Sequence, residues 1–117
     1  MGTHNDFGKQ GEQLAEQFLI NKGYSIIARN YHFGKGEIDL ITTHQGMLVF
    51  VEVRARKDEE IIRVTDTISK KKKRLLLKTA NHFIDEKDID LECRFDVIIL
   101  IGYGKPTIEH IEEAIVP

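Results

Sequence analysis

Residues 36–55 read GEIDLITTHQGMLVFVEVRA, and this stretch decides the fold. Segments 37–43 and 47–55 are rich in Val, Ile, Leu and Thr, which is the composition of β-strands. The intervening His44-Gln45-Gly46 has the length and the glycine of a tight turn. The stretch therefore predicts an antiparallel hairpin.

The second strand of this hairpin is apolar on both sides. Side chains alternate along a strand, so one face carries three valines, whereas the other begins with Leu48 and Phe50 and turns polar at Glu52 and Arg54. A strand with two apolar faces belongs inside a sheet that is covered on both sides. We expect a central strand whose far end opens onto polar surroundings.

The remaining chain predicts two helices and further strands around this hairpin. Apolar residues recur at helical spacing over about 6–22, with Gly23 placed to end that helix in a left-handed conformation. Ser69 is the expected N-cap of the second helix. The other expected elements are a strand at 24–28, a loop at 30–36, a charged connection at 58–66, the second helix at about 70–85, a buried strand at 94–101, and an edge strand or short helix at 107–114.

A helix between two strands usually makes them parallel, so the second helix adds a parallel pair to an otherwise antiparallel sheet. The order of elements predicts an α/β fold, with a mixed central β-sheet flanked by helices. Neither a repeat nor a low-complexity linker divides the chain, so we expect one domain over residues 1–117.

Composition limits the classes of function. The net charge of -2 and the pI near 6.2 give no overall electrostatic reason to expect a polyanionic partner, so any such argument must come from local clusters. Cys93 is the only cysteine, which excludes an internal disulfide framework and fits a reducing compartment. No signal peptide or membrane-spanning segment is recognisable. We expect a cytoplasmic protein without a membrane partner.

Two carboxylates interrupt the apolar strands of the hairpin. Asp39 shares a face of its strand with Glu37, and Glu52 shares a face of the next strand with Arg54. A buried carboxylate must be neutralised or must bind a cation. Asp39 and Glu52, one from each strand, suit Mg²⁺, which takes one or two protein carboxylates and keeps several waters. The alternative is that Arg54 pairs with one of them as a structural ion bridge.

The second helix begins with a cluster of cations. Lys72 falls on the apolar face of the helix and is expected to point inward. Cations are unfavourable at a helix N-terminus by roughly 0.3 to 1 kcal/mol each, which makes anion binding the better explanation of the cluster. The alternative is a solvent-exposed run of positive charges that balances the acidic residues 58–60. The other cluster members are Lys70, Lys71, Lys73 and Arg74.

Glu12 and Asp96 are further acidic candidates. Glu12 borders the buried stripe of the first helix and could reach a cleft beside the hairpin, although most helix glutamates are simply exposed. Asp96 interrupts an apolar run two residues after Arg94. It could pair structurally with Arg94 or another cation, or it could line the cleft, and we favour the structural role. The five histidines show no paired metal-ligand spacing.

A set of short motifs runs in order over nearly the whole chain: Gly8-x-x-Gly11-Glu12, Asn30-Tyr31, GEIDLI at 36–41, FVEVRAR at 50–56, Lys72, Arg94-Phe95-Asp96 and IEHI at 108–111. This pattern resembles the YraN family, an uncharacterised bacterial family with a fold similar to archaeal Holliday-junction resolvases, within the PD-(D/E)XK nuclease superfamily. The hairpin motif combined with Arg-Phe-Asp is the specific part of the resemblance.

The resemblance implies a restriction-endonuclease-like core in which Asp39 and Glu52 bind Mg²⁺ or Mn²⁺ and Glu12 assists. In the superfamily a lysine stands two residues after the motif glutamate, but this chain has Arg54 there. Arginine can stabilise charge on a phosphate but does not readily lose a proton to act as a base. Lys72, facing inward from the helix, is a candidate substitute.

The main functional hypothesis is a metal-dependent hydrolase of DNA phosphodiester bonds, acting on branched or otherwise structured DNA. Arg54 and Lys72 would stabilise charge at the scissile phosphate, while Arg56, Arg63 and the basic helix start would hold the flanking backbone. One alternative is a non-catalytic nucleic-acid-binding module that keeps the nuclease fold. Another is a protein-interaction domain that uses its sheet edge. Relatives of this fold often form homodimers, which would suit a branched junction.

Overall fold

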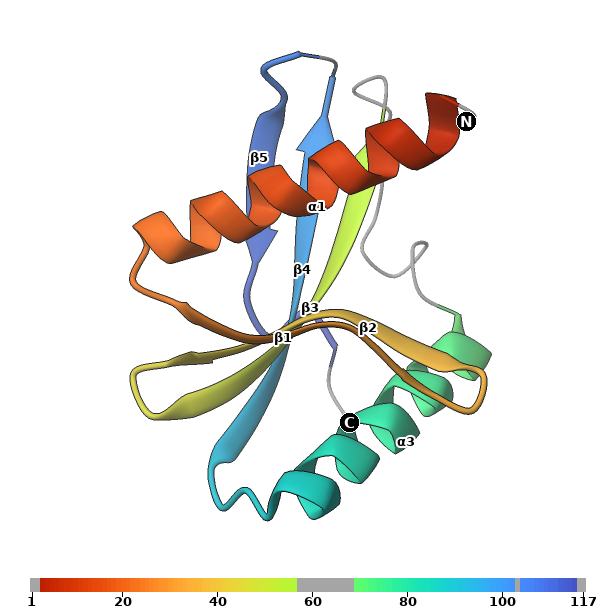
Figure 1. Ribbon diagram of the computed structural model, residues 1–117, viewed down its shortest axis with the longest axis vertical. Helices are drawn as coiled ribbons and strands as arrows, with labels where there is room; N and C mark the ends of the chain where they lie inside the picture. The colour runs from red at the N-terminus through yellow and green to blue at the C-terminus, as the bar shows by residue number, and fades with distance from the viewer. Residues whose placement is uncertain (1–2, 57–68, 103, 116–117) are drawn as a thin grey trace.

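A computed structural model describes residues 3–56, 69–102 and 104–115 (Figure 1). The expected connection at 58–66 and Arg63 therefore lie outside the described residues. The helices and strands, in chain order, are α1 (Thr3–Asn21), β1 (Ser25–Phe33), β2 (Gly36–His44), β3 (Met47–Arg56), α3 (Lys70–Lys87), β4 (Glu92–Ile101) and β5 (Thr107–Ile111).

The strands form one mixed sheet in the order β1-β2-β3-β4-β5. β3 and β4 are parallel, and the other neighbouring pairs are antiparallel. α3 lies between the parallel strands in the chain, as a crossover helix requires. This arrangement confirms the predicted α/β fold with a mixed sheet and flanking helices, and it is compatible with an endonuclease-like core. Neither helix of the described chain has the length and apolar character that crossing a lipid bilayer requires.

The turn of the central hairpin is the predicted one. Gln45 and Gly46 both have positive φ values, 50° and 79°, which match the right-handed twist of the strands that they join. The segment after β4 forms the edge strand β5, so of the two alternatives at 107–114 the strand is right. Gly23 ends α1 with φ 93°, as expected.

The predicted loop at 30–36 is wrong, because β1 continues to Phe33. The pairs Tyr31–Ile38 and Phe33–Gly36 hold this second half of β1 to β2. Asn30 adopts a left-handed conformation at φ 48°, which asparagine tolerates better than most residues, and the strand resumes after it. Turn-forming residues therefore marked an irregularity inside the strand rather than its end.

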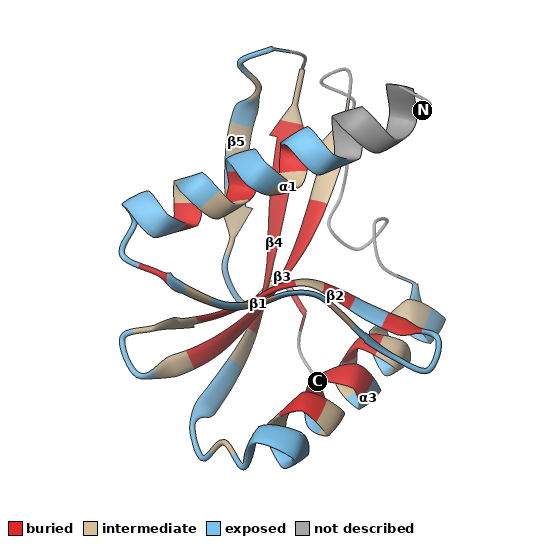
Figure 2. Ribbon diagram, viewed as in Figure 1, coloured by how far each residue is buried: buried red, intermediate tan, exposed pale blue. Residues whose placement is uncertain are grey.

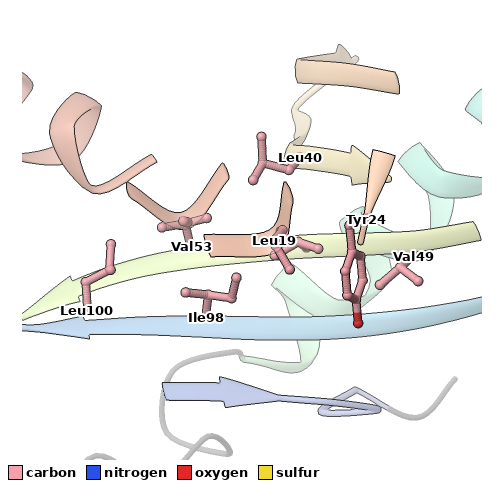
Figure 3. Packing of buried hydrophobic residues seen from close by; sticks show 9 residues of the cluster. Leu19, Tyr24, Leu40, Val49, Val53, Ile98 and Leu100 are labelled. Carbon is pink, nitrogen blue, oxygen red and sulfur yellow. The ribbon is translucent and has the colours of Figure 1, made fainter. Parts of the chain in front are cut away.

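The two helices cover opposite faces of the sheet (Figure 2). On the α1 side, Ala15 and Leu19 pack in one cluster with the three valines of β3 and with Ile98 and Leu100 of β4. Figure 3 shows Leu19 of this cluster among the side chains of β3 and β4. On the α3 side, Leu76 and the buried aromatic rings of the sheet form a second cluster. β3 is therefore the central strand with two buried faces that the sequence predicts.

Candidate functional site

Asp39 lies where the β2–β3 ladder ends. The last pair of that ladder is Leu40–Val51. Leu40 packs in the cluster beneath α1, but Ile38 packs in the cluster beneath α3, although regular alternation would place both on one face. β2 therefore turns about its axis at Asp39. The Asp39 carboxylate reaches across to β3 and accepts a hydrogen bond of 2.8 Å at Oδ2 from the backbone N–H of Val53.

Glu52 is the buried acid of β3, with 4% of its surface exposed. Its Oε2 lies 3.1 Å from a terminal nitrogen of Arg54 and 3.4 Å from Nζ of Lys72. Its Oε1 is buried and has no hydrogen-bond partner among the described residues. The ion bridge that was the alternative interpretation of Arg54 is therefore present, but it uses only one oxygen of the carboxylate.

Burial raises the pKa of both carboxylic acids. The pKa of Glu52 rises to about 8, chiefly because burial disfavours the ionised form and secondly because Asp39 lies nearby, while Arg54 partly opposes the rise. Burial also raises the pKa of Asp39, against the lowering effects of the Val53 amide and of Arg54. A divalent cation beside these two carboxyl groups would favour their ionised forms and so oppose both shifts.

These side chains line one cavity of about 340 Å³ between the open end of the hairpin and the start of α3. Its charged lining comprises three carboxyl groups and four cationic groups, namely Glu37, Asp39, Glu52, Lys35, Arg54, Lys71 and Lys72. The structure thus brings together four of the predicted catalytic residues, Asp39, Glu52, Arg54 and Lys72. A site with inner carboxylates and surrounding cations can accept both a metal ion and an anion such as a phosphate.

Gly36 sets how closely the hairpin approaches α3. A Cβ atom at Gly36 would lie 1.9 Å from Oγ1 of Thr79 and 3.0 Å from the carbonyl oxygen of Leu75. The absence of a side chain therefore lets the start of β2 lie directly against the helix. This contact carries Lys35 and Glu37, the residues on either side of Gly36, into the cavity lining.

Lys35 and Glu37 are the charged lining residues that were not predicted as site residues. Glu37 was placed on the face of Asp39 but was given no role, and Lys35 fell in the segment read as a loop. Gly36 could have pointed to both residues, since a glycine in a strand often marks a place where another part of the chain approaches the backbone closely.

The start of α3 forms the basic wall. Ser69 caps the helix by accepting a hydrogen bond of 3.2 Å from the backbone N–H of Lys72, as predicted. Of the cations expected to bind nucleic acid, Lys71 lines the cavity. The others lie outside its lining, on the exposed or half-buried surface around it: Lys70, Lys73, Arg74 and Arg56.

Glu12 of α1 is not part of the cavity lining. It lines a separate hollow of about 200 Å³ together with Arg29 and Leu40. Its pKa is nevertheless raised, first by burial and then by the negative charges of Asp39 and Glu37. Glu12 is therefore close enough to Asp39 and Glu37 for electrostatic repulsion, but it does not line the cavity with them.

The donor set fits a divalent cation with an open coordination sphere. Among the described residues no group of three or more His, Cys, Asp or Glu side chains is arranged as a complete metal site. Asp39 and Glu52 supply one carboxylate from each of two strands, and Oε1 of Glu52 is buried with no hydrogen-bond partner within residues 3–56, 69–102 and 104–115. Mg²⁺ commonly binds through one or two carboxylates and completes its octahedron with water and phosphate oxygens, so these residues match its needs.

Asp96 has the structural role that we favoured. It is fully buried and accepts hydrogen bonds of 2.8 and 3.0 Å from Arg94 and one of 3.1 Å from the backbone N–H of Glu113, and Nε2 of His110 lies 2.7 Å from its Oδ2. Burial alone would raise the pKa of Asp96, but the hydrogen bonds from His110 and Arg94 hold it below its ordinary value. Asp96 is not among the residues that line the cavity.

Comparison with known proteins gives one consistent result. The sequence pattern of the "Uncharacterised protein family UPF0102" matches residues 11–100. A UPF0102 protein of Phocaeicola vulgatus is 42% identical over 100% of this chain and 98% of its own length. A UPF0102 protein of Flavobacterium psychrophilum is 43% identical, with 97% of each chain covered. A third, from Saccharophagus degradans, is 43% identical over 97% of this chain and 96% of its own.

Proposed function

The chain belongs to the uncharacterised protein family UPF0102, and on the geometry of the cavity we propose that it is a metal-dependent nuclease that hydrolyses phosphodiester bonds of DNA. Asp39 and Glu52 would hold Mg²⁺ or Mn²⁺. The resemblance to junction resolvases makes branched or otherwise structured DNA the preferred class of substrate. The exposed thiol of Cys93 suits the cytoplasm, where we place the protein.

The observation that carries the proposal is Oε1 of Glu52, which has no hydrogen-bond partner in the part of the chain that the structure describes. A buried oxygen without a hydrogen bond costs about 1–3 kcal/mol, and more if it is charged, so it needs an explanation. Arg54 and Lys72 both bind the other oxygen, which leaves Oε1 available to a further ligand. A cation between Glu52 and Asp39 would remove this cost and would also favour the ionised form of both acids.

The chain's own residues account for binding and for charge stabilisation. A bound divalent ion would supply a Lewis acid and lower the pKa of a coordinated water. Lys71 and the N-terminus of α3 would bind the phosphate at the mouth of the cavity. Arg54 and Lys72, already at the Glu52 carboxylate, would offset the negative charge that develops on the phosphate. Arg54 would not serve as a general base, because it stays protonated.

The cations outside the cavity would hold the flanking nucleic acid. Lys70, Lys73 and Arg74 extend the basic surface of α3, and Arg56 lies at the end of β3. Such contacts bind phosphates without reading the base sequence, so binding should weaken steeply with salt. A homodimer would present two such sites to the arms of a junction, and we include it in the proposal.

Cleavage assays with isosteric variants test the proposal. Labelled junction, flap, single-stranded and duplex DNAs are incubated with Mg²⁺ or Mn²⁺. We expect cutting of at least one substrate, and a loss of about 100-fold or more in Asp39→Asn and Glu52→Gln. Asp85→Asn and Glu86→Gln are matched controls, because these exposed acids lie at the far end of α3. Undiminished cutting by both site variants contradicts the proposal.

A specific observation favours a second candidate function, a nucleic-acid-binding module without hydrolysis. The residue two positions after Glu52 is Arg54, and its guanidinium is held in the pair with Glu52 rather than free to exchange a proton. Arg54→Lys separates the two candidates. Cutting that appears only in Arg54→Lys favours the binding module, whereas cutting by the unaltered protein favours the nuclease.

A further inference from the structure

Phe33, the last residue of β1, is an aromatic residue that is 41% exposed beside the cavity. Isolated exposed apolar residues are common and need no explanation in themselves. The other large apolar residues that the described chain exposes are aliphatic: Leu14, Ile20, Ile27 and Leu91. Phe33 differs from them because its ring is stacked on a second ring.

The ring of Phe33 lies on that of His82 in α3, with centroids 3.8 Å apart and planes inclined by 14°. His82 is fixed in turn, because its Nδ1 lies 2.6 Å from the hydroxyl of Tyr31. Tyr31 packs edge-on against buried Phe83, with centroids 5.1 Å apart and planes at 83°. The Phe33 ring is thus supported by a series of contacts that continues to buried Phe83, and we call Phe33 and His82 the aromatic platform.

The platform adjoins the basic cavity. Phe33 pairs with Gly36 across the β1–β2 turn, and Lys35 of the same turn lines the cavity. Figure 1 shows this turn beside the first part of α3. Leu75 of α3 also lines the cavity, and His82 follows it by seven residues, about 10 Å along the helix. That length corresponds to about three stacked nucleotides of one strand.

We propose that the Phe33–His82 stack binds an unpaired nucleic-acid base, and that the substrate is therefore DNA with a single-stranded or unstacked segment next to the phosphate in the cavity. The inference takes DNA as the ligand from the proposed function, on which it rests, and it narrows the class of substrate. Within a duplex both faces of a base are covered by its neighbours, so only an unstacked base can lie on an aromatic ring. Lys35 and Lys71 complete the pattern of a basic track beside an aromatic platform that is typical of single-strand binding.

Binding measured without cleavage tests this site. The probes are a fluorescein-labelled single strand of about 12 nucleotides and the blunt duplex of the same sequence, titrated in EDTA and followed by fluorescence anisotropy. Phe33→Leu keeps an apolar side chain but removes the aromatic face. We expect roughly 5- to 100-fold weaker binding of the single strand and less than about a twofold change for the duplex. Phe33→Tyr should bind the single strand nearly as well as the unaltered protein.

Ile27→Ala is the matched control, because Ile27 is 45% exposed on the same strand and does not line the cavity. It should bind both probes normally, and unchanged thermal unfolding of each variant shows that the fold is kept. The inference is overturned if Phe33→Leu leaves single-strand binding unchanged, if it weakens both probes equally, or if neither probe binds. The cleavage assay on Asp39→Asn tests the nuclease proposal separately, so selective loss in Phe33→Leu without any cutting would support this site and reject hydrolysis.

Discussion

Nζ of Lys72 lies 3.4 Å from Oε2 of Glu52, so the first turn of α3 is joined electrostatically to the buried end of β3. The two residues line the cavity from different elements and are 20 positions apart in the chain. Lys72 is 39% exposed, whereas the Glu52 side chain is 6% exposed, so the pair spans the boundary between the solvent and the interior. Because of this position, we expect Lys72 to contribute little to the stability of the fold but much to cleavage.

Lys72→Met should therefore cost little stability but much activity. A partly exposed ion pair is worth about 0–1 kcal/mol, so chemical denaturation should shift by no more than that. Loss of a cation at the phosphate should lower cleavage by about 100-fold. Lys87→Met, which removes an exposed lysine in the last turn of α3, is the matched control and should cut normally. Equal loss of activity in both variants would mean that general charge, rather than Lys72 itself, matters.

Two substitutions of Asp39 separate the two roles of its carboxylate, which accepts a hydrogen bond from Val53 and lines the cavity. Asp39→Asn keeps an oxygen for the Val53 amide, so we expect near-normal stability without metal. Asp39→Leu leaves that amide without its partner and should destabilise the protein by about 1–3 kcal/mol. Added Mg²⁺ should raise the melting temperature of the unaltered protein but of neither variant. A metal-induced rise of the same size in Asp39→Leu, which has no oxygen to offer a metal, would exclude Asp39 as a ligand.

Glu52 makes stability depend on pH. Its pKa is about 8 in the folded protein, against an ordinary value of 4.5, so between these values the folded state binds more protons than the unfolded state. Stability is then greatest near the lower value and falls as pH rises, by up to about 1.4 kcal/mol per pH unit, until Glu52 ionises in both states. Glu52→Gln does not titrate, so denaturation between about pH 5 and about pH 9 should show a flatter profile.

The same ionisation should govern metal binding. A divalent cation competes with the proton for Glu52, so calorimetric affinity for Mg²⁺ should increase with pH up to about 8. Glu86→Gln, at an exposed position of α3, provides the control and should follow the unaltered protein in both measurements. Parallel stability profiles for Glu52→Gln and the unaltered protein would show that Glu52 does not carry the effect.

Asp96, unlike Glu52, should affect the stability of the fold but not metal binding. Asp96→Ala leaves the half-buried guanidinium of Arg94 and the ring of His110 without their buried acceptor, and should cost about 3–5 kcal/mol in chemical denaturation. Glu112→Ala removes a more exposed acid, 3.7 Å from the same Arg94, and should cost less than about 1 kcal/mol. The fraction of Asp96→Ala that remains folded should bind Mg²⁺ normally, because Asp96 does not line the cavity.

The sequence predicted the elements that obey a simple periodicity. β3 was found because two apolar faces require a central strand, and α3 was found with its Ser69 cap because capping is a local interaction. Lys72 was expected to face inward from helical spacing alone, and it does contact Glu52. These features depend on residues that are close in the sequence, so the strand alternation and the helical repeat reveal them directly.

What the sequence could not supply is geometry set by distant contacts. The turn of β2 at Asp39 follows from the end of its pairing with β3 and from opposite packing of Ile38 and Leu40, neither of which has a local signal. The strand character of residues 31–33 depends on packing against α3, and turn-forming residues concealed it. The separation of Glu12 from the cavity is likewise a matter of how α1 lies on the sheet.

The contact between Gly36 and Thr79 bears on how this sequence can vary. Any side chain at position 36 would collide with Oγ1 of Thr79, so substitutions at these two sites are not independent. Thr79→Ala would clear the nearest obstacle and should partly restore the stability lost in Gly36→Ala, although the Leu75 carbonyl at 3.0 Å still limits the space. Among relatives of this chain, we therefore expect glycine to persist at the position of Gly36, and departures from it to occur together with a smaller residue at that of Thr79.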